Sequence, residues 1–254
     1  MGRKTGKLND IISDFDFFIS TFASNYEDKV DDEKFPEALH LATAYAYQLA
    51  IAHLLHTGDC REYKTNLLRS AQYRVRLLKQ AAQDPAQYQD YSWSYFLAPF
   101  FGAIIAGDTD LAKEIATLSV FKENSSFEFH DEYLYSRILY QLVLSDYSAS
   151  EQTTSLLGEY LDDWSGEETP RYRAVNALLE KKQIQFEKAI RDLLEAHGDY
   201  YSKIGEGLVD DLVAFSTEQF VCLEAVALVT IANRLGIKTQ KHYKGIPSSA
   251  LITL

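Results

Sequence analysis

The sequence is poor in the residues that mark turn-rich or cross-linked folds. It has 2 cysteines, 5 prolines and 12 glycines in 254 residues. So few turn-forming residues disfavour a sandwich or barrel with many tight turns. Cys60 and Cys222 stand far apart and outside any disulfide or zinc motif. This cysteine usage fits a reducing cytoplasm, which is where we expect the protein to reside.

Signals for membrane insertion and secretion are also missing. No apolar run approaches the ~20 residues that a membrane-spanning helix requires. The first ten residues, MGRKTGKLND, contain no apolar segment of the signal-peptide type. We therefore expect no membrane partner.

Positive charge is scarce as well. The chain has 25 Lys and Arg against 37 Asp and Glu, which gives a net charge of −12. Binding to nucleic acids depends on clustered basic residues, so we expect no nucleic-acid partner. An acidic protein of this kind is suited to a partner with a basic surface, because opposite charges steer association.

Helical periodicity dominates what the sequence does contain. Apolar residues recur at three- and four-residue steps over residues 35–57, where Pro36 suits the first turn of a helix. Gly58 suits the end of that helix, and Asp59 suits the N-cap of a second helix over residues 60–83. The two helices are predicted to form an antiparallel hairpin.

The same plan occurs a second time. An apolar, aromatic helix is predicted over residues 93–106, with a distortion at Pro99. Gly107 and Asp108 then form a turn into a helix over residues 109–118. Within the same region, Tyr88, Tyr91 and Tyr95 flank Trp93; an excess of tyrosine is a weak interface signal, since most of these rings are expected to cover the core.

The remaining sequence completes an all-α prediction. Further helices are expected at 8–22, 131–147, 150–163, 170–182, 185–201 and 217–235. Ser216 and Gln219 fit a capping box for the last of these, and Gly236 fits its end. We expect one domain over residues 1–254, built from nine to eleven helices stacked as antiparallel hairpins. Residues 1–34 form its N-terminal helical segment, and residues 237–254, which include Pro247, form a docked tail.

Candidate metal ligands do not add up to a site. Glu37 and His40 form one Glu-x-x-His pair, but a di-iron bundle needs two. His53, His56 and Asp59 follow at three-residue steps and would need a further ligand from elsewhere. Histidines are also favoured at a helix C-terminus by the helix dipole. We expect no metal and no cofactor, and a helical metalloenzyme is the third-ranked interpretation.

Motifs for nucleophilic catalysis and phosphate binding are absent from the sequence. It contains no Gly-x-Ser-x-Gly elbow, no P-loop and no dinucleotide fingerprint. Cys222 lies in the apolar run and is interpreted as a small core residue. Cys60 follows a helix turn, but no histidine can be assigned as its partner. We expect no catalytic residues and no enzymatic activity.

One basic cluster interrupts the acidic chain. Residues 61–80 hold six basic residues against Glu62: Arg61, Lys64, Arg69, Arg74, Arg76 and Lys79. A nucleic-acid surface needs such a stripe. A solvated helix face paired with acidic neighbours is the simpler interpretation.

An acidic cluster supplies the candidate partner-binding residues. These residues surround or include one tryptophan near the end of a predicted helix: Asp162, Asp163, Trp164, Glu167 and Glu168. An exposed aromatic ring among carboxylates is suited to binding a basic protein. In the alternative interpretation the acids solvate a loop and Trp164 anchors the helix end in the core.

Three stretches resemble the immunity proteins of bacterial polymorphic-toxin systems, specifically the immunity protein 49 family. They are LATAYAYQLAIAHLLHTGD, FLAPFFGAIIAGDTDLAKEIATL, and the region from LLEAHGDYY to the C-terminal end, with Gly236 and Pro247 at the family's end-of-helix glycine and closing proline. The resemblance implies a mostly helical cytoplasmic protein, encoded beside a toxin, that neutralises the toxin by tight binding and occlusion of its active site. It implies no catalytic residues. The alternative is a tetratricopeptide-like scaffold that binds a cellular peptide or protein; self-association as a homodimer stays open.

Overall fold

Helices form the whole framework of the computed structural model, which describes residues 2–26, 32–119, 128–204 and 212–251. No strand occurs in these ranges, where the β pairing is limited to an isolated bridge between Tyr243 and Ile246. The helices follow in the order α1 (Gly2–Tyr26), α2 (Phe35–Thr57), α3 (Cys60–Gln83), α4 (Pro85–Tyr88), α5 (Ala98–Ala106), α6 (Thr109–Leu118), α7 (His130–Leu144), α8 (Glu151–Asp163), α9 (Pro170–Leu179), α10 (Gln183–Ile204), α11 (Leu212–Ser216), η1 (Glu218–Phe220), α12 (Leu223–Arg234) and η2 (Ser248–Ala250).

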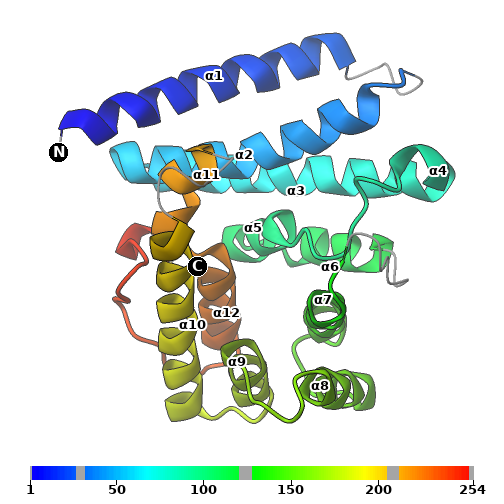
Figure 1. Cartoon of the computed structure of the whole chain (residues 1–254), viewed down its shortest axis with the longest axis vertical. Coiled ribbons are helices and arrows are strands. Elements are labelled where there is room, and N and C mark those ends of the chain that lie inside the picture. Colours follow the sequence, from blue (N-terminus) through cyan, green and yellow to red (C-terminus); the bar gives the residue numbers. More distant parts are fainter. Residues whose placement is uncertain (1, 27–31, 120–127, 205–211, 252–254) are drawn as a thin grey trace.

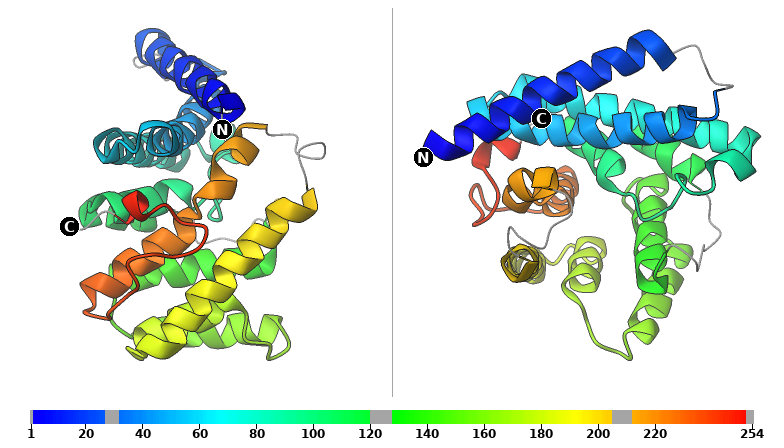
Figure 2. Two further views of the ribbon diagram at one scale, coloured as in Figure 1. Left: turned by 90° about the vertical axis from the view of Figure 1, so that its left-hand side faces the viewer. Right: turned by 45° about the horizontal axis from the view of Figure 1, so that its top comes forward.

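The helices stack as hairpins, as the sequence predicts. Helices α1, α2 and α3 lie one upon another at one end of the molecule, and α5 and α6 lie beneath them (Figure 1). Two further hairpins, α7–α8 and α9–α10, occupy the opposite end, with α12 between them and the upper layers (Figures 1 and 2). The described residues make a single compact helical domain, which confirms the predicted fold class.

The two Gly-Asp turns have the predicted geometry, in which glycine ends one helix and aspartate caps the next. Gly58 and Gly107 have φ values of 72° and 90°, a left-handed conformation that glycine adopts without a side-chain clash. The carboxylate of Asp59 accepts hydrogen bonds from two free amides of the first turn of α3, and that of Asp108 accepts one from the amide of Leu111. Gly236, with φ 75°, ends α12 in the same way.

The core is centred on α12. Its residues from Leu223 to Ala232 are almost all buried, and the helix packs on α5. The chain after α12 returns to this core, because Ile237, Tyr243 and Ile246 are buried within it and Pro247 opens the short turn η2. Smaller apolar clusters join α1 to α2 and α3 through side chains such as Phe22.

The predicted helix over residues 93–106 is too long. Helix α5 starts at Ala98, so Pro99 stands in its first turn and causes no distortion. A proline there replaces an amide that would have no partner within the helix in any case. The five residues before Ala98 have an irregular backbone.

The predicted helix over residues 217–235 is also wrong in its first part. Ser216 ends α11, the turn η1 follows, and α12 begins only after Cys222. The capping box does not form, because the Gln219 side-chain amide donates to the carbonyl oxygen of Phe215. Within the described residues, Val213–Arg234 is the one stretch that is long and apolar enough to cross a membrane, and most of it is buried inside the fold.

Candidate functional site

The acidic residues singled out in the sequence lie on one exposed loop. Asp162 and Asp163 end α8, and Glu167 and Glu168 precede α9; all four side chains are exposed. Trp164 is the C-cap residue of α8 and is 40% exposed. The interpretation of Trp164 as an anchor in the core is therefore wrong. We call residues 162–168 the acidic loop.

The basic helix α3 does not present a uniform solvated face. Lys79 forms an ion pair with Glu114 of α6 at 2.7 Å, and the Arg76 guanidinium lies 4.9 Å from the centre of the Phe35 ring. Arg74 is completely buried, which contradicts the expectation of a solvated side chain. A buried guanidinium requires internal hydrogen-bond acceptors, and these lie in the irregular segment before α5.

This irregular segment, residues 91–97, carries a concentration of rings, and we call it the aromatic segment. Tyr91, Trp93, Tyr95 and Phe96 are all partly exposed. The Trp93 and Tyr95 rings stack, with centroids 5.4 Å apart and planes within 7°. The imidazole of His40 on α2 packs against Tyr91, Trp93 and Phe96, with its centroid 5.1 Å from that of Phe96.

Buried polar side chains from other elements hold the backbone of the aromatic segment. Arg74 donates hydrogen bonds to the carbonyl oxygens of Tyr91, at 2.7 Å, and Trp93. The buried Glu128 carboxylate accepts hydrogen bonds from the amides of Ser94 and Tyr95, at 2.6 and 3.1 Å. Such bonds replace the ladder that a helix or sheet would supply, since a buried backbone group without a partner is costly.

Other contacts complete this network. The Tyr140 hydroxyl on α7 donates to the Ser94 carbonyl at 2.8 Å, and the Ser94 hydroxyl donates to Glu128 at 2.6 Å. Burial lowers the pKa of Arg74 to about 10, so its guanidinium remains charged at neutral pH. Burial, assisted by the nearby charge of Arg74, also lowers the pKa of His40 to about 4. His40 therefore remains a neutral ring among the aromatic side chains.

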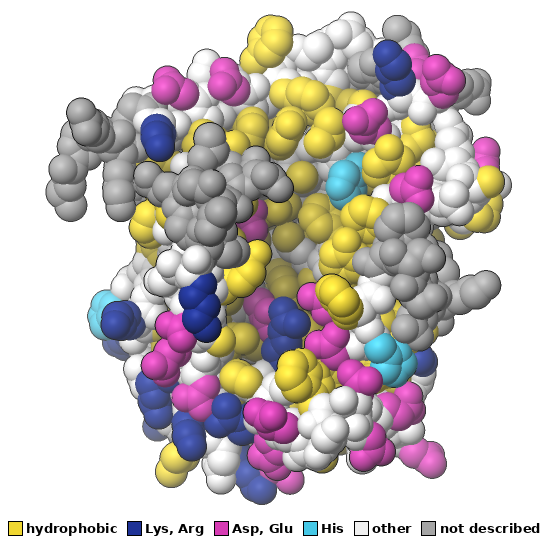
Figure 3. Space-filling model, in the orientation of Figure 1, with side chains coloured by type: hydrophobic (Ala, Val, Ile, Leu, Met, Phe, Trp, Pro, Cys, Tyr) yellow, Lys and Arg dark blue, Asp and Glu magenta, His cyan; other side chains and the backbone are white. Residues whose placement is uncertain are grey.

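A hollow opens in the middle of this face of the molecule, with hydrophobic side chains along its walls and charged groups at its lower end (Figure 3). The aromatic segment crosses the same face between α4 and α5 (Figure 1). Tyr47 of α2 contacts both the aromatic segment and the turn η1. Its ring lies 6.2 Å from that of Phe96, and its hydroxyl donates to the Glu218 carboxylate at 3.0 Å.

A second charged group lies between α7, α9 and α12. The Arg171 guanidinium makes two hydrogen bonds to the Glu224 carboxylate, at 3.0 and 3.1 Å, and lies 4.7 Å from the centre of the Tyr135 ring. The Tyr135 hydroxyl donates to the same carboxylate at 2.7 Å. Burial raises the pKa of Glu132, and the charge of Arg171 partly opposes the shift. The charge of Glu132 is also the second cause, after burial, of the raised pKa of Tyr95. The charged group around Arg171 and Glu132 therefore acts on the aromatic segment.

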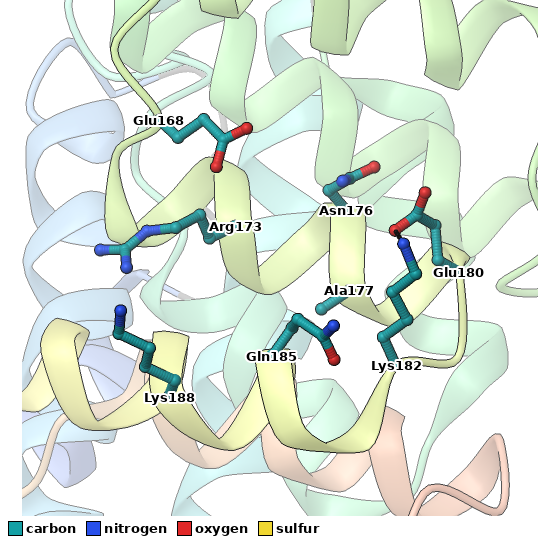
Figure 4. Close-up of a pocket in the computed structure, with 8 residues that line it drawn as sticks. All are labelled: Glu168, Arg173, Asn176, Ala177, Glu180, Lys182, Gln185 and Lys188. Atoms are coloured by element: carbon teal, nitrogen blue, oxygen red, sulfur yellow. Dashed lines mark ion pairs between the residues drawn. The ribbon is translucent and has the colours of Figure 1, made fainter.

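A cavity of about 260 Å³ lies between α9 and α10, and Glu168 of the acidic loop lines it. Side chains of the two helices face each other across it (Figure 4). Its Glu180 and Lys182 form an ion pair at 2.7 Å, and Arg173 donates to Asp192 at 2.7 Å. Both pairs lie within the protein, whereas the buried Nε of Arg173 has no hydrogen-bond partner.

The candidate ligands and nucleophiles do not converge on a reactive centre. Within the described ranges, no three His, Cys, Asp or Glu side chains gather as a metal site would require. The Cys222 thiol is buried at the head of α12, and burial raises its pKa to about 12. It is a core residue, as predicted, although it precedes the helix. The exposed Cys60 thiol donates to carbonyl oxygens, including that of Ser249 at 3.5 Å.

Sequence reasoning missed the aromatic segment as a site because it assigned most of it to a helix. The sequence signal was the group of tyrosines around Trp93, whose arrangement depends on partners distant in the chain.

One of the comparisons with known proteins confirms the resemblance seen in the sequence. The family described as Immunity protein 49 matches residues 31–250, which is most of the chain and includes both the aromatic segment and the acidic loop. Neither the curated proteins nor the solved structures contain a significant match. On the strength of the match across α2 to η2, the chain belongs to the Immunity protein 49 family.

Proposed function

We propose that this protein neutralises a cognate toxin domain by binding it tightly and covering its active site. The family match over residues 31–250 is the observation that carries this proposal. The partner is the toxin domain encoded by the adjacent gene, and the two proteins meet in the bacterial cytoplasm. Inhibition by binding requires surface complementarity and no catalytic group in the inhibitor.

Charge supports a partner with a basic surface. The chain has a net charge of −12, and the acidic loop presents four exposed carboxylates around Trp164. Complementary charge of this kind raises association rates about 10- to 1,000-fold at low salt. Fast association is useful to an inhibitor that must capture its target before the target acts. We propose the acidic loop as part of the contact surface.

Co-expression tests the proposed function. The C-terminal domain of the large protein encoded by the neighbouring gene would be induced with and without this chain, and growth and co-purification would be measured. We expect the domain to arrest growth alone, to be harmless with this chain, and to co-elute with it at fixed stoichiometry. A neighbour that is harmless alone, or that arrests growth despite this chain, would refute the proposal and leave the scaffold interpretation.

A charge-reversal variant tests the acidic loop separately. Replacement of Asp162, Asp163, Glu167 and Glu168 by lysine should slow association with the toxin domain at least about 10-fold at low salt. The control reverses four exposed acids elsewhere, Asp10, Asp14, Glu151 and Glu195, which makes the same change in net charge. Equal association rates for the two variants would remove the acidic loop from the contact surface.

A further inference from the structure

We infer that the aromatic segment and the hollow beside it form the anchor site for an arginine- or lysine-bearing segment of the toxin domain. This inference rests on the proposed function and assigns its main contact surface. It differs from the acidic loop in location, because the anchor lies between α2, α5 and α7. Three observations support this inference: the aromatic rings, the charges around them and the rigidity of the backbone.

The rings offer faces that suit a cation. Trp93 and Tyr95 stack in parallel, so each ring covers part of one face of the other, and both side chains remain partly exposed. A guanidinium or ammonium group over such a ring is attracted by its negative face. Tryptophan and tyrosine are also the residues that most often dominate binding energy at protein interfaces.

The charges around the rings favour a cation over an anion. The exposed carboxylates of Glu37 and Asp90 lie near Tyr91, whose pKa is raised by burial and by these two charges. Burial and then the charges of Glu132 and Glu128 raise the pKa of Tyr95, and the charge of Arg74 opposes the shift.

Two arginines act on these groups, Arg74 on Tyr95 and Arg171 on Glu132, and both are held by other parts of the protein. Arg74 is buried and bonded to backbone carbonyl oxygens, and Arg171 is held by both oxygens of Glu224. The Arg74 guanidinium already lies over the Phe96 ring, 5.4 Å from its centre, so the proposed cation contact is with Trp93 and Tyr95. His40 is neutral because burial, and then the charge of Arg74, lower its pKa to about 4. An incoming cation would meet those two rings and the carboxylates around them.

The segment is already ordered in the shape that it presents. Arg74, Glu128 and Tyr140 fix five main-chain hydrogen-bonding groups between Tyr91 and Tyr95. A surface held in this way loses little conformational entropy on binding, which is how rigid aromatic residues gain affinity.

The chain contains 2 tryptophans, one at each candidate surface, and this makes the inference directly testable. The protein would be labelled with 5-fluorotryptophan, so that its fluorine NMR spectrum holds one signal from Trp93 and one from Trp164. The variants Trp93→Phe and Trp164→Phe assign the two signals. The probe is the unlabelled C-terminal domain of the protein encoded by the neighbouring gene.

We expect the Trp93 signal to shift when this domain is added. A shift of the Trp164 signal alone, or binding with neither signal shifted, would overturn the inference and leave the proposed function intact. A Trp93 signal that shifts with the concentration of this chain alone would show a second copy in the hollow and would also overturn it. Failure of the unmodified chain to bind the domain would refute the proposed function, and the anchor site with it.

Charge reversal at the rim provides an independent measurement that does not touch the core. Glu37→Lys combined with Asp90→Lys should weaken binding of the same domain at least about 10-fold. The matched control, Asp10→Lys combined with Asp14→Lys, makes the same charge change on exposed residues of α1, which lies outside the matched family region. Equal affinity of the two double variants would contradict the anchor site.

Discussion

Replacement of Arg74 by methionine should destabilise the protein strongly, although it removes a charge from the core. The side chain is fully buried and donates to the carbonyl oxygens of Tyr91 and Trp93. Hydrogen bonds from a charged donor contribute about 1.5–3 kcal/mol each. The nearby Glu128 carboxylate would also lose a neighbouring positive charge.

The opposing effect is the desolvation of the guanidinium, which methionine avoids. Because the substitution leaves two carbonyl oxygens and a carboxylate without their donor or counter-charge, we expect a net loss of about 3–5 kcal/mol. For a chain of this size the melting temperature should fall by about 6–20 °C. Thermal and urea unfolding followed by circular dichroism would measure the change.

Two control variants separate the bonding of Arg74 from its charge. Arg74→Lys keeps the charge but loses the two-pronged donor geometry, so its stability should lie between those of the unmodified protein and the methionine variant. Arg69→Met removes an arginine of the same helix that donates to Asn66 at 2.8 Å, and should cost less than about 1 kcal/mol. If Arg74→Met changed the free energy of unfolding by no more than Arg69→Met, the network would contribute nothing net to stability.

Other changes test separate parts of the fold. A Cβ on Gly102 would lie 3.2 Å from the Leu67 carbonyl oxygen, so Gly102→Ala should lower stability by about 1–3 kcal/mol in urea unfolding, whereas Gly158→Ala, with open space around it, should raise stability by about 0.5–1 kcal/mol. A gain of stability for Gly102→Ala, or a loss for Gly158→Ala, would contradict the packing at these two glycines. Asp108→Ala should cost about 1 kcal/mol by the same assay through loss of the N-cap of α6; an unchanged midpoint would argue against that cap. Because the pKa of His40 is lowered to about 4 in the folded state, the unfolded chain binds more protons between pH 6.5 and pH 4, and stability should fall by about 2 kcal/mol over that interval. His40→Gln should lose this part of the pH dependence, and an unchanged slope would refute the assignment.

The sequence was sufficient where structure depends on neighbours in the chain. The bounds of α2, α3 and α6 match their predicted ranges, because glycine and aspartate fix each turn through bonds within a few residues. Helix α9 likewise begins at Pro170, where the predicted helix begins, with Thr169 as its N-cap residue. The exposed position of the acidic loop was one of two alternatives, and composition alone does not decide between them.

The sequence failed where distant side chains decide the backbone path. The aromatic segment has an apolar, helix-compatible composition, but its backbone bonds to Arg74 and Glu128, which lie far away in the chain. The break before α12 has a similar origin, since Glu218 accepts hydrogen bonds from Tyr47 and Gln48 of α2 at 3.0 Å. Periodicity contains no information about such partners. It therefore predicted one continuous helix at each place.

Most of the hydrogen bonds that hold the aromatic segment involve its backbone, so the path of the chain depends little on which side chains the segment carries. Apart from the bond to the Ser94 hydroxyl, the hydrogen bonds described between the segment and Arg74, Glu128 and Tyr140 involve peptide groups, which every residue type except proline provides in full. Arg74 also lies over the Phe96 ring, 5.4 Å from its centre, so position 96 takes part in the frame. Substitutions at positions 93 and 95 can therefore alter ring size, polarity or charge while the chain follows the same course. Under the proposed function, a changed toxin could be matched by exchanging a few side chains on an unchanged frame, much as antibodies vary their loops on a fixed sandwich.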